Sequence, residues 1–209
     1  MINRITPLLL SLPFAKNWLT TNAIIIMVFF FCSCEDTKTD STNIVDYGVV
    51  INEINYNSSD GFDPEDWVEL HNPTNETIAI GLWAFKDDND DHVFTLSENI
   101  VLSPGQYLVL CKDADVFSEL FPNVSKFVGD LGFGLSASGE LVRLFESNGL
   151  LIDEVEYDDV VPWPILADGN GPTVELINPS LDNALGENWA ASDGYGTPGA
   201  VNSVYVADE

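Results

Sequence analysis

Basic residues are scarce in this sequence. It has 7 Lys and Arg against 34 Asp and Glu in 209 residues, a formal net charge of −27 at pH 7. The basic residues stand singly along the chain: Arg4, Lys16, Lys38, Lys86, Lys112, Lys126 and Arg143. Proteins that bind nucleic acid or anionic lipid headgroups gather Lys and Arg on one face. The charge balance therefore argues against a nucleic-acid partner and against electrostatic binding to a membrane.

Cysteine and histidine are scarce too. The three cysteines stand at positions 32, 34 and 111, which is no disulfide framework. Cys111 ends an apolar segment and is expected to be a small buried side chain. His71 and His92 have no nucleophile motif such as G-x-S-x-G beside them. The sequence thus predicts no catalytic residue and no enzyme activity.

A long apolar run is absent as well. Residues 23–31 (AIIIMVFFF) form a run of nine, whereas a transmembrane helix needs about 20 apolar residues. The run fits the core of a signal peptide, and the Cys34 that follows Ser33 resembles the lipidated cysteine of bacterial lipoproteins. Cys32 fits less well because the bulky Phe31 precedes it.

This N-terminal pattern predicts a lipoprotein-type signal peptide over residues 1–33, lipidation of Cys34 and a polar tether over residues 34–47. Acidic residues directly after Cys34 resemble the surface-export signals of some bacterial lipoproteins. We therefore expect an outer-membrane lipoprotein of the bacterial cell envelope, displayed at the surface and attached to the membrane through its lipid anchor only.

The rest of the chain has enough apolar residues for a core, with 45% hydrophobic and 11% aromatic residues overall. From Gly48 onward these residues come in short runs of strand length, rich in β-branched and aromatic side chains. The expected strands are residues 49–55, 67–71, 77–80, 92–96, 106–111, 141–145, 150–157 and 173–177. Asn148-Gly149 predicts a hairpin turn, and residues 114–121 predict one short helix. The sequence thus predicts an all-β sandwich or barrel.

The order of these segments resembles the lamin tail domain family. The motifs that carry the resemblance are Val50-Ile51-Asn52-Glu53-Ile54, Asp66-Trp67-Val68-Glu69-Leu70-His71-Asn72, Gly81-Leu82-Trp83, residues 102–110, residues 138–144, residues 152–157, Pro162-Trp163-Pro164, residues 174–179, Asn188-Trp189 and Gly196-Thr197-Pro198-Gly199. The resemblance implies an immunoglobulin-like β-sandwich over residues 48–202, followed by an acidic tail over residues 203–209. His71 stands where family members often carry Tyr.

The resemblance also implies that the sandwich has no enzymatic activity and acts as an adhesive or targeting module. Most motif residues have a structural interpretation. Trp67, Trp83, Trp163 and Trp189 are expected in the sandwich core. Acidic residues within strands are too numerous for any pair to indicate a glycosidase. For Glu53 and Glu69 we expect hydrogen bonding at the sandwich edge.

One acidic turn is the candidate ligand site. It consists of Asp87, Asp88, Asn89, Asp90 and Asp91, and consecutive carboxylates on a turn can converge on Ca²⁺, which takes six to eight oxygen ligands. His92 replaces the glycine that an EF-hand loop requires, so any calcium site here is of a looser kind, and a solvated acidic turn is the alternative. A second acidic loop holds Asp60, Asp63, Glu65 and Asp66.

Together these features predict a non-catalytic, envelope-anchored binding or structural module that presents its β-sandwich to a protein or glycan partner. Two alternatives stay open. A calcium-dependent carbohydrate-binding module requires at least two of the four motif tryptophans on one exposed face. An enzyme, or an accessory domain of a secreted hydrolase system, requires His71 to contact a serine or cysteine in a cleft.

Overall fold

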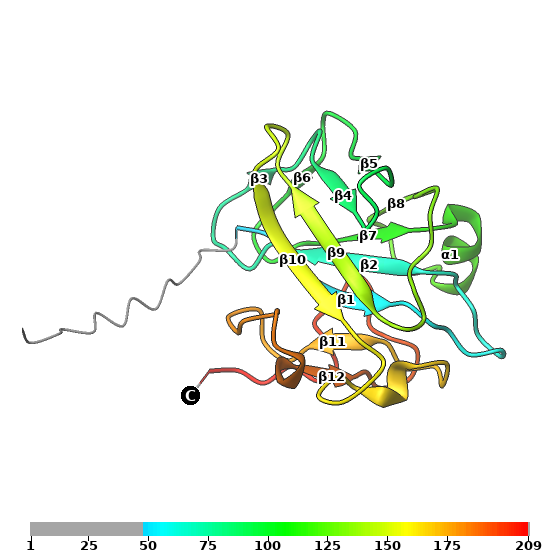
Figure 1. Ribbon diagram of the computed structural model, residues 1–209. Helices are drawn as coiled ribbons and strands as arrows, with labels where there is room; N and C mark the ends of the chain where they lie inside the picture. The colour runs from blue at the N-terminus through cyan, green and yellow to red at the C-terminus, as the bar shows by residue number, and fades with distance from the viewer. Residues whose placement is uncertain (1–47, 209) are drawn as a thin grey trace, which may run out of the picture. The chain divides into compact units, whose positions relative to one another are not determined.

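A computed structural model describes residues 48–208 (Figure 1). The predicted signal peptide (1–33), Cys34 and the predicted tether (34–47) lie outside the described residues. Within residues 48–208, no helix has the length and apolar character to cross a membrane.

The regular secondary structure of residues 48–208 is almost entirely β-strand. Its strands are β1 (Val50–Asn55), β2 (Trp67–His71), β3 (Ile78–Ala79), β4 (Ala84–Lys86), β5 (Phe94–Thr95), β6 (Val101–Leu102), β7 (Tyr107–Cys111), β8 (Phe127–Gly129), β9 (Glu140–Phe145), β10 (Leu151–Tyr157), β11 (Val174–Leu176) and β12 (Trp189–Ala191). One α-helix, α1 (Ala114–Leu120), follows β7, and two 3₁₀ turns span Ile165–Ala167 and Gly186–Asn188.

These strands form two main layers. The larger sheet has the order β12-β11-β1-β2-β7-β8, and the smaller has the order β10-β9-β4-β5. Figure 1 shows β9 and β10 crossing over β1 and β2, so that one face of each sheet is turned toward the other. Apolar side chains of both sheets fill the space between the layers, among them Ile51, Leu70, Leu144 and Val155. The predicted all-β, immunoglobulin-like sandwich is confirmed.

Alternation along the strands separates the core face of the larger sheet from its outer face. In β2, Val68 and Leu70 belong to the core between the sheets, whereas Trp67, Glu69 and His71 point the other way. The pairing of β1 with β2 shifts register between Ile51 and Glu53. Such a bulge lets two successive residues share one face. Asn52 therefore lies on the outer face together with Glu53.

The outer face of the larger sheet is covered at one end by α1. Phe117 of this helix packs with Trp67, Val109 and Cys111 in a second apolar cluster. Asp113 caps the helix by accepting a hydrogen bond from the Val116 N–H at 2.9 Å. The rest of the outer face lies under the C-terminal segment, where the candidate site is found.

Several predicted elements are confirmed. The second strand has its predicted bounds, the helix ends one residue early, and the Asn148-Gly149 turn joins β9 to β10 with Gly149 at φ +85°. The four motif tryptophans are all buried, at 0 to 6% exposed. This burial contradicts the exposed face that the carbohydrate-binding alternative required. The sequence did not predict the short strands β4, β6, β8 and β12.

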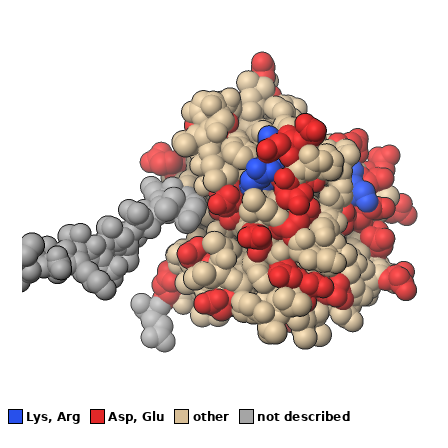
Figure 2. Space-filling model, in the orientation of Figure 1, with Lys and Arg blue, Asp and Glu red and all other residues tan. Residues whose placement is uncertain are grey.

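The surface is strongly acidic (Figure 2). The basic residues within 48–208 are all bonded to oxygen atoms of the chain. Lys112 pairs with Glu65, Arg143 with Asp90, Lys86 with Asp90, and Lys126 donates to the Val101 carbonyl. The fold therefore presents many carboxylates and few free cations to a partner.

Candidate functional site

Three buried glutamates form a row across the outer face of the larger sheet. Glu53 on β1 lies opposite Glu175 on β11 and Glu69 on β2, and all three are fully buried. Their strands lie in the interior of the sheet order. The expectation of hydrogen bonding is confirmed, but its predicted place at the sandwich edge was wrong, because the C-terminal chain covers the middle of this sheet.

The carboxylates hold that C-terminal chain in place. Glu69 Oε2 accepts a hydrogen bond from the Gly199 N–H. Glu175 accepts from the Thr197 hydroxyl and the Ser203 hydroxyl, both at 2.7 Å. We call residues 196–206 the C-terminal strap, since they run over the three glutamates and are tied to each of them. These buried carboxylates have no basic partner and accept hydrogen bonds from backbone, hydroxyl and side-chain amide groups.

Two asparagines add a further tie. Asn52 Nδ2 donates to Asn202 Oδ1 at 2.7 Å, and Asn202 Nδ2 donates to the Asn52 carbonyl at 3.0 Å and the Leu176 carbonyl at 2.8 Å. Asn52 Nδ2 also donates to Glu69 Oε1 at 3.0 Å. The strap is thus bonded to strands from both halves of the sequence.

Burial changes the acidity of the glutamate row. Desolvation raises the pKa of Glu69 to about 8, against the effect of its hydrogen bonds from Gly199 and Asn52. Desolvation also raises the pKa of Glu53 well above its ordinary value, and the neighbouring charges of Glu69 and Glu175 act in the same direction. Glu53 and Glu69 therefore retain protons at pH values where exposed glutamates have lost them.

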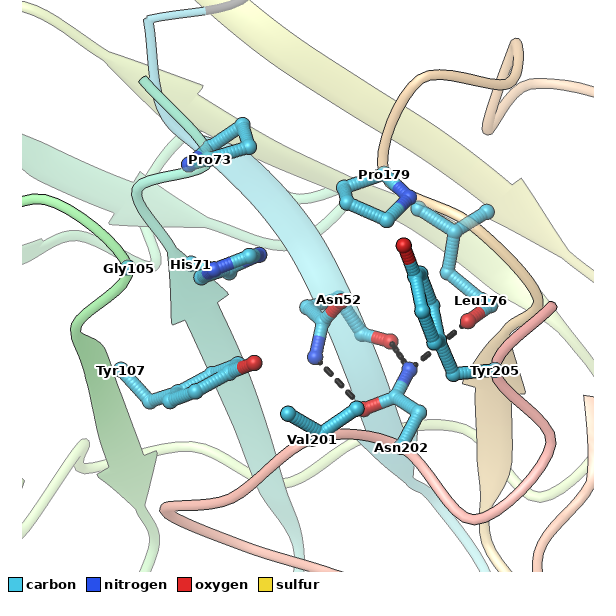
Figure 3. Close-up of a pocket in the computed structure, with 10 residues that line it drawn as sticks. All are labelled: Asn52, His71, Pro73, Gly105, Tyr107, Leu176, Pro179, Val201, Asn202 and Tyr205. Carbon is cyan, nitrogen blue, oxygen red and sulfur yellow. Dashed lines mark hydrogen bonds between the residues drawn. The ribbon is translucent and has the colours of Figure 1, made fainter. Parts of the chain in front are cut away.

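Beside this row the outer face opens into a pocket of about 330 Å³ (Figure 3). Its walls come from β1, β2, β7, β11 and the strap. The lining residues are Asn52, His71, Pro73, Gly105, Tyr107, Leu176, Pro179, Val201, Asn202 and Tyr205. None of these side chains is an acid, a lysine or an arginine, and most are apolar or aromatic. We call this cavity the His71 pocket.

His71 gives the pocket its main polar group. Its imidazole stacks on the Tyr107 ring at 4.3 Å between centroids, and Figure 3 shows both rings extending toward the middle of the pocket. The residue is 8% exposed, and Nδ1 is buried with no hydrogen-bond partner. Desolvation lowers the pKa of His71 to about 4, so the imidazole is neutral at pH 7.

A second hollow adjoins the His71 pocket and shares Gly105 and Tyr107 with it. Its volume is about 310 Å³, and Lys126 lies in its wall. The ammonium of this lysine donates to Gln106 Oε1 at 2.7 Å. The two hollows together form an elongated concave surface along the strap.

The predicted acidic turn does not converge as a set of five. Asp87 is buried and bonded to His92 Nδ1 at 2.6 Å and to the Asn89 N–H at 2.8 Å. Asp90 forms an ion pair with Arg143, with 3.1 Å between Asp90 Oδ1 and Arg143 Nη1. Asn89 Oδ1 accepts from the Asp91 N–H at 3.0 Å.

Two residues of the turn instead lie close to Glu140, which belongs to another strand. Asp87, Asp88 and Glu140 of β9 place one carboxylate oxygen each within 4.8 Å of one another. Sequence spacing missed Glu140, because β9 approaches the turn only in the folded sheet. In the second acidic loop, Glu65 and Asp66 lie near the Lys112 ammonium, at 2.5 and 3.9 Å.

Within residues 48–208, neither histidine is hydrogen-bonded to a serine or a cysteine. His71 contacts Tyr107 rather than a serine or cysteine, and His92 is bonded to Asp87. Cys111 is buried as expected, and desolvation raises its pKa to about 12, which keeps the thiol protonated. The arrangement leaves an open pocket beside His71 that can take a side chain or a small group.

Sequence reasoning missed most of the pocket. Tyr107, Val201 and Tyr205 stand in unrelated segments, and only the folded strap brings them together. The one available signal was His71, which stands where the family resemblance led us to expect Tyr.

Comparisons with known proteins agree with the geometry. The Lamin Tail Domain family matches residues 46–159. The protein "Multifunctional procollagen lysine hydroxylase and glycosyltransferase LH3" from Homo sapiens and from Pongo abelii is 32% identical over 114 residues, which are 54% of this chain and 13% of those relatives. This chain therefore corresponds to a small part of their length. The family match covers more than half of the chain and the fold is the expected sandwich, so this chain belongs to the lamin tail domain family.

Proposed function

We propose that this chain is a non-catalytic binding module of the bacterial cell envelope, which presents the outer face of its larger sheet to a protein partner. The observation that carries this proposal is the His71 pocket, which is open, largely apolar and built from five separate parts of the fold. Pockets of this kind bind groups that the fold itself does not supply. A lipid on Cys34, with residues 34–47 as a tether, would hold the module at the membrane.

A protein partner is favoured over a glycan. The carbohydrate-binding alternative relied on exposed tryptophans, and all four motif tryptophans are buried. The accessory role in a secreted hydrolase system has no feature of residues 48–208 in its favour. The name of the relative LH3 describes a much longer enzyme, of which this chain matches 13%.

Calcium binding remains a proposal in a narrower form. Asp87, Asp88 and Glu140 supply oxygen atoms close enough to share one ion. Asp90 is committed to Arg143, so it would not take part. Such an ion would stabilise the turn between β4 and β5 without touching the His71 pocket.

Quantitative co-purification from chemically crosslinked cells tests the binding function. We compare the native chain with Tyr205→Ala and with Tyr195→Ala. The two tyrosines are equally exposed, at 45% and 47%, but Tyr195 stacks on Phe62 away from the pocket. A partner that is retained by the native chain and by Tyr195→Ala, and lost with Tyr205→Ala, supports the proposal. Identical sets of proteins for all three chains contradict it.

A further inference from the structure

The His71 pocket has ring side chains on two opposite sides. In Figure 3 the imidazole of His71 and the phenol of Tyr107 extend inward from one side, and Tyr205 and Pro179 stand opposite. Asn52 and Asn202 form the floor, and their amide hydrogens are already donated to other groups. A ligand therefore meets aromatic side chains on two sides and a floor whose amide groups have no free hydrogen to donate.

The electrostatics of the pocket favour a cation. No lysine or arginine lines it, and His71 is neutral at pH 7 because burial lowers its pKa to about 4. The whole chain carries a formal charge of −27. The field of such a molecule attracts positive groups and repels carboxylates and phosphates. A neutral aromatic pocket in an acidic protein is the setting in which cation–π contacts are strong.

The shape of the pocket favours a flat cation. A guanidinium is planar, stacks on aromatic rings and donates from its edges, whereas an ammonium is compact and strongly hydrated. The volume of about 330 Å³ is at the lower end of ligand pockets, which suits one side chain rather than a folded element.

We propose that the His71 pocket binds an arginine side chain from a basic segment of the partner protein. This inference rests on the proposed binding function and names the chemistry of the contact. The adjoining hollow has Lys126 in its wall, so it would repel a second cation. The arginine is thereby directed to the end of the binding surface where Tyr205 stands.

The test uses the full chain in detergent micelles and a fluorescent peptide of alternating glycine and arginine. Its control peptide has citrulline at each arginine, which keeps the planar shape and removes the charge. Fluorescence anisotropy measures both affinities at several salt concentrations. We expect binding of the arginine peptide that weakens with salt, and at least ten-fold weaker binding of the citrulline peptide.

Protein variants separate the pocket from general attraction to an acidic surface. Loss of the aromatic face in Tyr205→Ala should weaken binding about ten-fold. The matched variant Tyr195→Ala should bind as the native chain does. Equal binding of the two peptides, equal affinities of the two variants, or no binding at all would overturn the arginine proposal. If the peptide fails while Tyr205→Ala still loses a co-purified partner, the binding function stands and only its arginine chemistry is wrong.

Discussion

Asn52 and Asn202, 150 residues apart in the sequence, hydrogen bond to each other in both directions. This pair joins the bulge of β1 to the strap, and both side chains are buried. Residues beyond the family match therefore complete the His71 pocket rather than form a separate tail. Stability of the strap and the shape of the His71 pocket should depend on the same contacts.

We predict that Asn202→Ala destabilises the chain by about 2 to 4 kcal/mol, because three buried hydrogen bonds are lost and their partners stay unsatisfied. Urea unfolding of the native chain and the variant measures this difference. Asn170→Ala is the control, since this exposed asparagine donates only to the Asp168 carbonyl. If the free energy of unfolding falls by the same small amount in both variants, the asparagine pair does not hold the strap.

We predict that the melting temperature falls as the pH rises from 6.5 to 8.5. Glu69 has a pKa of about 8 when folded, against 4.5 ordinarily, so the folded state binds the extra proton and loses this advantage as the pH rises through 8. The opposite contribution of His71, whose pKa is about 4 in the fold and 6.5 ordinarily, is complete only above pH 6.5, where the unfolded imidazole finishes losing its proton, and it reduces the fall near that pH. Asp153, with a pKa of about 6, has mostly titrated by then.

Glu69→Gln isolates this effect. The amide cannot titrate, so the fall in melting temperature over the same pH range should become smaller. Glu53, whose pKa is also raised by burial, remains in the variant and accounts for any residual slope. An unchanged slope in Glu69→Gln would show that Glu69 is already ionised in the fold.

We predict that Ca²⁺ raises the melting temperature by several degrees and that excess chelator reverses the rise, since a ligand bound only to the folded state stabilises it. Asp88→Asn should abolish the rise because Asp88 belongs to the close group with Asp87 and Glu140. Asp91→Asn should leave it intact. A rise that survives Asp88→Asn, or no rise in the native chain, would make this turn a solvated acidic loop.

We predict that Cys34→Ala releases the chain from the membrane and abolishes labelling with a radioactive fatty acid. Lipid attached to a cysteine adds the apolar surface that anchors a protein otherwise without a membrane contact. Partition into detergent measures the change. Cys32→Ala should remain anchored and labelled, and equal loss from both variants would contradict the assignment of Cys34.

The sequence predicted the elements whose signal is local. Residues 67–71 form a run of strand length, rich in apolar side chains, that corresponds to β2, and Asn148-Gly149 defines the hairpin between β9 and β10. Strands of two or three residues, such as β6 and β12, carry too few side chains to show a period. Glu53 and Glu69 were placed at an edge because nothing in the sequence tells which strands are interior.

The candidate site depended on contacts between distant segments. Tyr205 lines the pocket only because Asn202 and Ser203 fix the strap on β11 and β1. Glu140 joins Asp87 and Asp88 only through the pairing of β4 with β9. Such contacts follow from the topology of the sheets, which a single sequence does not reveal.

Photo-crosslinking in living cells tests the central claim most directly. A photoreactive residue at Val201, which is 58% exposed on the rim of the His71 pocket, is compared with one at Leu151, which is exposed on β10 of the other sheet. We predict that irradiation yields one discrete protein adduct at Val201 and none at Leu151. No adduct at Val201, or the same adducts at both positions, would contradict the assignment of this face as the binding surface.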